Sequence, residues 1–183
     1  MMNRLLCGSL ILLYGVPTMA QAAPAGDKAR LTLGVPAYVY HPKDRPGTRD
    51  WNDGWFNNEG VVVDLSWPVW TLGQDTKLRA GVSGGAFDNS IFRTSVFFGG
   101  VAEIETHVTP QLAFSLGTYA GGITGYENNV SPAIAPYIGT SYAVTEHLEI
   151  GLRGFWLPAE TIAGSDLAPS DSYIAAFTVG TRF

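Results

Sequence analysis

Hydrophobic and polar side chains alternate along much of this chain with a period of two, which is the spacing of β-strands that present two different faces. The alternation is clear in residues 77–88, 94–106, 147–157 and 172–183. In the last of these stretches one face carries Tyr173, Ala175, Phe177, Val179, Thr181 and Phe183, and the other carries Ile174, Ala176, Thr178, Gly180 and Arg182. The pattern predicts strands with one apolar face and one face of small or polar residues.

Eight such segments follow one another, each near the roughly 9–11 residues that a tilted membrane strand needs. They are residues 31–41, 60–71, 77–88, 94–106, 111–121, 132–143, 147–157 and 172–183. The connecting segments alternate between short and long, as the short turns and longer external loops of outer-membrane barrels do. We therefore expect an all-β fold: an eight-stranded, antiparallel, transmembrane up-and-down β-barrel.

The first 22 residues have the pattern of a cleaved secretory signal peptide rather than of a strand. Arg4 precedes an apolar run over residues 5–19, and the Ala-Gln-Ala sequence of residues 20–22 fits a small-x-small cleavage site. We expect cleavage after Ala22 and one β-barrel domain, residues 23–183, in the outer membrane of a bacterial cell.

Removal of the signal peptide leaves an acidic chain without cysteine. The remainder keeps 10 Lys and Arg against 16 Asp and Glu, a net charge of −6, and the one cysteine, Cys7, lies in the signal peptide. An acidic surface argues against nucleic acid as a partner. The absence of cysteine excludes disulfides and thiol chemistry in the mature chain.

The inward faces of the expected strands carry charges in one half and small residues in the other. The charged positions, Arg79, Glu103, Glu105, Arg153 and Arg182, fall towards the short turns, where they are expected to pair with one another because buried charges require partners. The small positions above them are Gly81, Ser83, Gly85, Ser115, Gly117, Gly151, Ala176 and Gly180. Small inward residues predict a cavity in the upper half, although glycines that relieve strain at barrel bends would give the same pattern.

Three prolines lie inside expected strands. Pro36 belongs to the first strand, and Pro132 and Pro136 belong to the sixth. Proline cannot donate to a strand ladder, so hydrogen bonds between neighbouring strands should be missing at these positions. The prolines predict a lateral opening towards lipid, unless each one only caps the start of its strand.

Polar residues gather where the first and third expected strands end. If the N-terminus is periplasmic, His41 and the triplet Asp88-Asn89-Ser90 all reach the outer rim, whereas His107 and His147 lie in turns at the opposite end. A hydroxyl that acts as a nucleophile, or that is acylated, needs a base within hydrogen-bond reach, and histidine is the usual one near neutral pH. His41 is therefore the histidine expected to work with Ser90.

Four stretches give the chain a resemblance to a known family. "VPAYVYHPKD", "GGAFDNSIFRTSVFFGGVAE", "TGYENNVSPAIAPYIG" and "GFWLPAE" fall in the order and spacing of PagP, the lipid A palmitoyltransferases of outer membranes. His41 after Pro36-Ala37 and the serine at Ser90 are similar to the hallmark site of that family. The chain departs from the family pattern in carrying Asn89 before the serine in place of aspartate.

The resemblance implies an acyl transfer from a phospholipid to lipid A in the outer leaflet, carried out by a membrane-embedded monomer that needs no cofactor and no metal. His41 would be the general base or acid and Ser90 the hydroxyl partner. Asp88 or Asn89 would orient these groups or polarise the ester carbonyl. The acyl chain would lie in the cavity of the upper half.

Other functions fit the same pattern. A non-catalytic barrel with a structural, adhesive or lipid-binding role is the main alternative, and a lipid A deacylase is another. Known outer-membrane deacylases use a His-x-Ser pair on one strand. The sequence "HVT" at residues 107–109 lacks that serine and lies at the end opposite to the outer rim, which argues against a deacylase. A soluble, lipocalin-like barrel would have to expose the apolar run Val61, Val63, Leu65 and Trp67 to water as one contiguous patch.

Overall fold

The computed structural model describes residues 28–40, 55–56, 59–89, 93–126, 130–158 and 171–183. The expected signal peptide, residues 1–22, lies outside the described residues, and so do His41 and Ser90. Asp88 and Asn89 are described.

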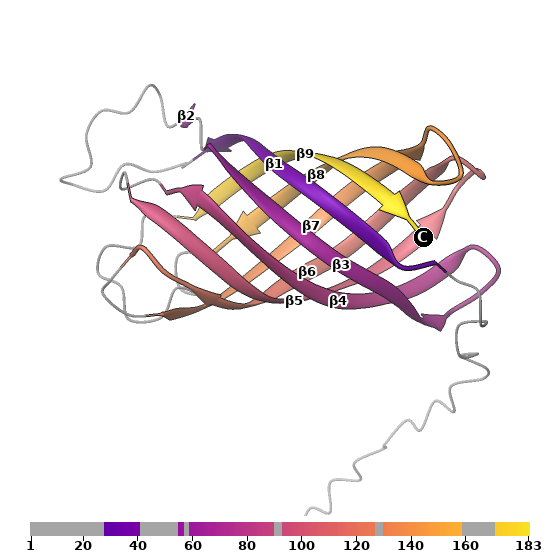
Figure 1. Ribbon diagram of the computed structural model, residues 1–183, viewed down its shortest axis with the longest axis horizontal. Coiled ribbons are helices and arrows are strands. Elements are labelled where there is room, and N and C mark those ends of the chain that lie inside the picture. Colours follow the sequence, from indigo (N-terminus) through magenta and orange to yellow (C-terminus); the bar gives the residue numbers. More distant parts are fainter. Residues whose placement is uncertain (1–27, 41–54, 57–58, 90–92, 127–129, 159–170) are drawn as a thin grey trace, which may run out of the picture.

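Among the described residues, eight long antiparallel strands form a closed barrel, and a strand of two residues pairs with the upper end of the first of them (Figure 1). The strands are β1 (Arg30–Tyr40), β2 (Trp55–Phe56), β3 (Gly60–Thr71), β4 (Thr76–Asp88), β5 (Thr94–His107), β6 (Leu112–Ile123), β7 (Ser131–Ala143), β8 (Leu148–Leu157) and β9 (Ser172–Arg182). Each long strand pairs with its neighbour in the sequence, and β1 pairs with β9 to close the wall. The prediction of an all-β, eight-stranded, up-and-down barrel is confirmed, and the bounds of the long strands differ from the predicted ones by at most two residues.

The two ends of the barrel differ in the connections they carry. The turns β3–β4, β5–β6 and β7–β8 lie at the end where the chain finishes, which we call the lower end (Figure 1). The upper end carries β2 and the last residues of β4, β6 and β8. His107 and His147 lie at the lower end, as expected, and Asp88 lies at the upper end.

The outer surface of the wall is apolar over the whole barrel. Leu33, Leu65, Phe114, Ile138 and Phe177 are all exposed, and they belong to five different strands. A continuous apolar belt of this kind is stable in lipid, where the strand hydrogen bonds satisfy the backbone. Among the described residues there is no helix with the length and hydropathy to cross a membrane.

The lumen is polar in its lower half and apolar in its upper half. Charged side chains that are almost fully buried fill the lower half, including Arg30, Arg79, Glu103, Glu105 and Glu149. Arg79 and Arg153 contact Glu103, and Arg182 contacts Glu105, so the predicted pairing of inward charges is confirmed. Arg30, which the prediction did not include, contacts Glu103, Glu105 and Glu149. The upper half holds an apolar cluster made by Phe97, Val101, Tyr119, Ile123, Tyr126, Ala133, Tyr137 and Leu157.

Most of the inward glycines make room for neighbouring groups rather than for a cavity. A Cβ atom at Gly117 would lie 2.5 Å from Cζ of Tyr137, and one at Gly180 would lie 2.7 Å from Cγ of Glu149. Of the eight small residues that we expected to line the cavity, Ala176 alone does so in the described structure. The upper half does contain a cavity, but large apolar side chains form most of its wall.

Candidate functional site

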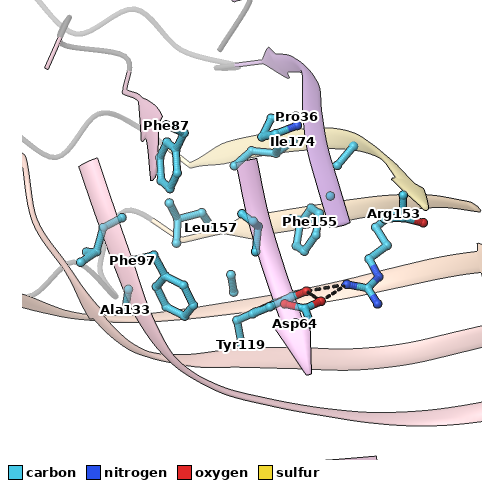
Figure 2. Close-up of a pocket in the computed structure, with 16 residues that line it drawn as sticks. Pro36, Asp64, Phe87, Phe97, Tyr119, Ala133, Arg153, Phe155, Leu157 and Ile174 are labelled. Carbon is cyan, nitrogen blue, oxygen red and sulfur yellow. Dashed lines mark hydrogen bonds and ion pairs between the residues drawn. The ribbon is translucent and has the colours of Figure 1, made fainter. Parts of the chain in front are cut away.

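The upper half of the barrel contains a cavity of about 100 Å³, which we call the upper cavity (Figure 2). All eight long strands contribute to its wall. Its lining residues are Gly34, Pro36, Val62, Asp64, Phe87, Phe97, Tyr119, Ile123, Ala133, Ala135, Arg153, Phe155, Leu157, Ile174, Ala176 and Thr178. The wall is largely aliphatic and aromatic, so this space suits a hydrocarbon group.

Asp64, Tyr119 and Arg153 close the cavity from below, and with Ser83 they form what we call the floor network (Figure 2). Arg153 Nη1 donates to Asp64 Oδ2 over 2.6 Å, and the Tyr119 hydroxyl donates to the same oxygen over 2.5 Å. Ser83 Oγ donates to the other carboxylate oxygen of Asp64 over 2.7 Å. Because these groups satisfy one another, they offer little free hydrogen-bonding capacity to a ligand above them.

The wall beside the upper cavity changes at the boundary between β7 and β8. The ladder between these strands runs from Ala143–Glu149 up to Tyr137–Phe155. Above that rung β7 continues in register with β6 from Pro136 to Ser131, and β8 continues in register with β9 to Leu157. We call the boundary of residues 131–136 with residues 156–157 the lateral seam.

Pro136 stands immediately above the last rung of the β7–β8 ladder. Its nitrogen carries no hydrogen, so it cannot extend the ladder upwards. A second interruption lies beside β1, whose ladder with β3 ends at Gly34–Val62 while β1 continues in register with β9. The register of β1 with β9 also shifts between Pro36 and Tyr38. The expectation that prolines accompany locally missing ladder bonds is therefore confirmed for Pro36 and Pro136.

A groove of about 570 Å³ crosses the outside of the wall at the lateral seam, and we call it the outer groove. It extends over β1, β9, β8, β7 and β6. Its lining residues are Tyr38, Tyr40, Leu116, Pro136, Tyr137, Ile138, Gly154, Phe155, Trp156, Tyr173, Ile174 and Ala175. Tyrosine and tryptophan on the outside of a membrane barrel are typical of the interface with lipid headgroups.

Asn89 ties two connections of the upper rim together. Its Nδ2 donates to Ser95 Oγ over 3.0 Å and to the carbonyl of Gly125 over 3.1 Å, and its Oδ1 accepts from the backbone N–H of Arg93 over 3.0 Å. Gly125 has φ near +93°, which favours glycine. Asn89 and Ser95 are buried, and we call Asn89, Ser95 and Gly125 the rim clamp.

Two other rim residues, Asp88 and Tyr126, differ from Asn89 in their contacts. Asp88 is exposed, and its Oδ1 accepts a hydrogen bond from Thr94 Oγ1 over 3.2 Å. Tyr126 follows the rim clamp and packs into the upper apolar cluster. Burial raises the pKa of Tyr126 to about 12, so its hydroxyl is neutral near pH 7.

The described structure thus separates the predicted site residues into three groups. Asp88 has an accessible carboxylate, Asn89 has its amide held in the rim clamp, and His41 and Ser90 lie outside the described residues. The catalytic assignment of these four residues stays a prediction. Among the described residues no group of histidine, cysteine, aspartate and glutamate side chains is arranged to hold a metal ion.

Solved structures with the same architecture are small membrane barrels. Neisserial surface protein A matches with a TM-score of 0.59 and 13% identity, covering 85% of this chain and 97% of that one. Ail, the attachment invasion locus protein of Yersinia pestis, matches with a TM-score of 0.52 and 10% identity over 86% of this chain and 99% of its own. The fold is that of a small outer-membrane β-barrel.

The outer membrane enzyme PagL also matches, with a TM-score of 0.50 and 12% identity over 82% of this chain and 97% of its own. No protein-family model matches the chain. No curated protein matches it either. At these identities the barrel fold is shared, and the resemblance to the palmitoyltransferases stays a prediction.

The sequence placed Arg153 and Ser83 on the inward face, but it did not indicate the other two residues of the floor network, Asp64 and Tyr119. Asp64 was detectable, because it is a charged residue at an inward position of a strand whose outward positions are valine, leucine and tryptophan. Tyr119 and Tyr137 gave no comparable signal, since tyrosine is common on both faces of membrane strands. Arg30 lay just outside the predicted first strand, residues 31–41.

Proposed function

We propose that this protein is a lipid-binding outer-membrane barrel that takes one acyl chain of a membrane lipid into its upper cavity. The proposal depends on one observation: an apolar cavity adjoins the lateral seam, where the β7–β8 ladder stops within the lipid-facing wall. Ala135 and Leu157 line the cavity from the two sides of that seam. A lipid chain in the bilayer would therefore meet an apolar interior without crossing the polar rim.

The lining of the upper cavity supports hydrocarbon as the ligand. The polar atoms of Asp64, Tyr119 and Arg153 are already bonded within the floor network. A polar ligand would find few partners here, whereas an alkyl group loses nothing by leaving lipid for an equally apolar wall. The cavity should therefore bind the acyl chain of a lipid in preference to its polar headgroup.

Nuclear magnetic resonance tests this proposal directly. The barrel is refolded in perdeuterated micelles with protonated dipalmitoylphosphatidylcholine, and nuclear Overhauser effects are sought between chain protons and the methyl groups of Ala133 and Ala176. Effects at these inward methyls are expected. Effects confined to outward methyls, such as those of Ile138, would contradict the proposal.

A matched pair of variants separates the cavity from the outer surface. Ala176→Leu adds volume inside the cavity and should remove the chain contacts at Ala133. Ala102→Leu adds the same volume on the exposed outer face of β5 and should leave those contacts unchanged. Equal behaviour of the two variants would argue against occupation of the cavity.

A second candidate function, acyl transfer from phospholipid to lipid A, is favoured by the position of the cavity relative to the rim. The cavity reaches Phe87, which directly precedes Asp88, and it also reaches Ile123 at the upper end of β6. A chain held there would present its ester near the rim. His41 would act as base or acid, Ser90 as the hydroxyl partner, and Asp88 as the orienting group.

Mass analysis of lipid A distinguishes the transferase from the lipid-binding barrel. Expression of the protein should raise the mass of lipid A by one acyl chain, and His41→Ala and Ser90→Ala should abolish the gain. His147→Ala, at the lower end, is the control and should retain it. Unchanged lipid A with correctly inserted wild-type protein would exclude transfer and leave the lipid-binding proposal standing.

A further inference from the structure

Phe155 and Ile174 stand between the upper cavity and the outer groove. Among the residues that the structure describes, they are the two that line both spaces. They face each other across the β8–β9 ladder, and residues paired in this way have neighbouring side chains. Phe155 also forms the last rung of the β7–β8 ladder, directly below the lateral seam.

The two spaces differ in size, and the inner one is small. The upper cavity has a volume of about 100 Å³, and the outer groove has about 570 Å³. An apolar cavity of roughly 150 Å³ accommodates benzene. The upper cavity therefore has little room for a long chain while Phe155 and Ile174 keep their present positions.

The contacts of Phe155 suggest which part of the wall can give way. Its ring lies 5.6 Å from the ring of Tyr119 and 5.4 Å from that of Tyr137, measured between centroids. Tyr119 is fixed by its bond to Asp64, and the Tyr137 hydroxyl donates to a carboxylate oxygen of Glu103 over 2.6 Å. Phe155 has no polar atom to anchor it, so it is the ring of this trio that can change rotamer at the lowest cost.

We propose that Phe155 and Ile174 form a movable partition, and that its displacement joins the outer groove to the upper cavity as one continuous binding path for an alkyl chain. This inference rests on the proposed function and adds the residues that control access to the site. In the joined state the part of the chain nearest the headgroup lies in the outer groove, beside Trp156 and Tyr173. The distal part passes between Pro136 and the displaced Phe155 into the cavity.

The path favours a single flexible chain as the ligand. It bends where it crosses the wall, and Tyr137 and Pro136 border the crossing on the side of β7. An unbranched alkyl chain can follow a bend by rotation about its single bonds, whereas a fused ring system cannot. The bend at the partition therefore favours flexible chains over rigid ring systems, and the apolar lining favours hydrocarbon over polar groups.

Methyl relaxation dispersion tests the partition. The method detects exchange on the microsecond-to-millisecond timescale, on which we expect a lipid chain to displace a buried side chain. The probe is protonated dipalmitoylphosphatidylcholine in perdeuterated micelles, and the reporter is the methyl group of Ala176. The double variant Phe155→Ala/Ile174→Ala should accelerate chain exchange at Ala176 by roughly tenfold or more, since it removes the packing that opposes displacement. Phe155→Trp should slow the exchange.

The control is Phe98→Ala, which removes an exposed aromatic ring from the outer face of β5, a strand with no described residue in the lining of the outer groove, and it should not change the rate. Chain contacts at Ala176 with an exchange rate that is the same in the wild type and the double variant would overturn the partition and leave the proposed function intact. Contacts that arise in the double variant alone would show that Phe155 and Ile174 form a fixed barrier in the wild type, which would overturn both their displacement and the proposed function. The absence of chain contacts from both proteins would overturn the partition and the proposed function together.

Discussion

Single residues in this barrel matter most where buried polar atoms depend on one another. The pair Asp64 and Arg153 is the clearest case, because both side chains lie in the lumen and each neutralises the other. Loss of one partner leaves an uncompensated charge, which costs about 3–5 kcal/mol in a buried site. Replacement of both partners by apolar side chains removes that penalty.

We therefore predict strong coupling between Asp64 and Arg153. Asp64→Leu and Arg153→Met should each lower the free energy of unfolding by about 3–5 kcal/mol, and the double variant should recover most of the loss. Urea unfolding of the refolded barrel in lipid vesicles measures the three values. Additive losses in the double variant would show that the two side chains act independently.

Asn89 carries a separate prediction, which concerns stability. Asn89→Ala removes three hydrogen bonds of the rim clamp and should lower the free energy of unfolding by about 1–3 kcal/mol. Thr94→Ala, which removes one bond to the exposed Asp88, should change it by less than about 0.5 kcal/mol. Equal effects of the two changes would contradict a structural role for Asn89.

At the scale of the elements, β7 and β8 share with β1 and β3 a ladder that stops well before the upper end of the barrel. β8 pairs with β7 only over residues Tyr137–Ala143 of β7. On its other side, β7 pairs with β6 over residues Ser131–Tyr142. The upper part of β7, residues 131–136, is therefore hydrogen-bonded to β6 but has no ladder with β8. A wall of this kind can open locally while the barrel stays closed elsewhere.

Cross-linking of the seam should exclude lipid from the cavity. Cysteines introduced at Ala135 and Leu157, joined by a short bis-methanethiosulfonate, should abolish chain contacts at the Ala176 methyl group, and reduction should restore them. The same cysteines capped singly with methyl methanethiosulfonate test whether added bulk alone has that effect. The control cross-link joins positions 140 and 152, which already face each other in the ladder, and should change nothing. Contacts that persist in the cross-linked barrel would place the route elsewhere.

The strands themselves were predictable because one physical constraint repeats in each of them. A wall with lipid outside and a lumen inside imposes alternation on every strand, and the short turns limit the register. The interior was less predictable, because inward positions are decided by contacts between distant strands. Gly117, for example, is small because the ring of Tyr137 lies against it, which alternation along one strand cannot show.

The candidate site was predictable only in outline. The prolines indicated where ladders would stop, because the missing N–H is a property of one residue. The floor network joins Asp64 of β3, Tyr119 of β6 and Arg153 of β8, and no local pattern reports such a meeting. The partition between cavity and groove likewise depends on two strands packing side by side.

For the whole molecule, the division of the lumen predicts that the barrel conducts no ions. Arg30, Arg182 and the glutamates they contact fill the lower half from several sides. The apolar upper cluster adds a second barrier, because ions are costly to move past apolar side chains. Planar bilayer recordings of the purified protein should show no regular open-channel steps. Uniform steps from homogeneous protein would contradict a closed lumen.

The contacts of Arg30 and Arg182 also bear on how the barrel is assembled. These arginines belong to the first and last strands, yet both reach Glu105 and Glu149 on strands in between. A sheet that has not yet joined its two edges would keep Arg182 beside Glu149, because β8 and β9 are neighbours, but Arg30 on β1 would not yet reach Glu105 and Glu149. Pairing of β1 with β9 therefore completes the neutralisation of these buried carboxylates, and we expect an open sheet to pay the cost of the contacts that Arg30 has not yet made.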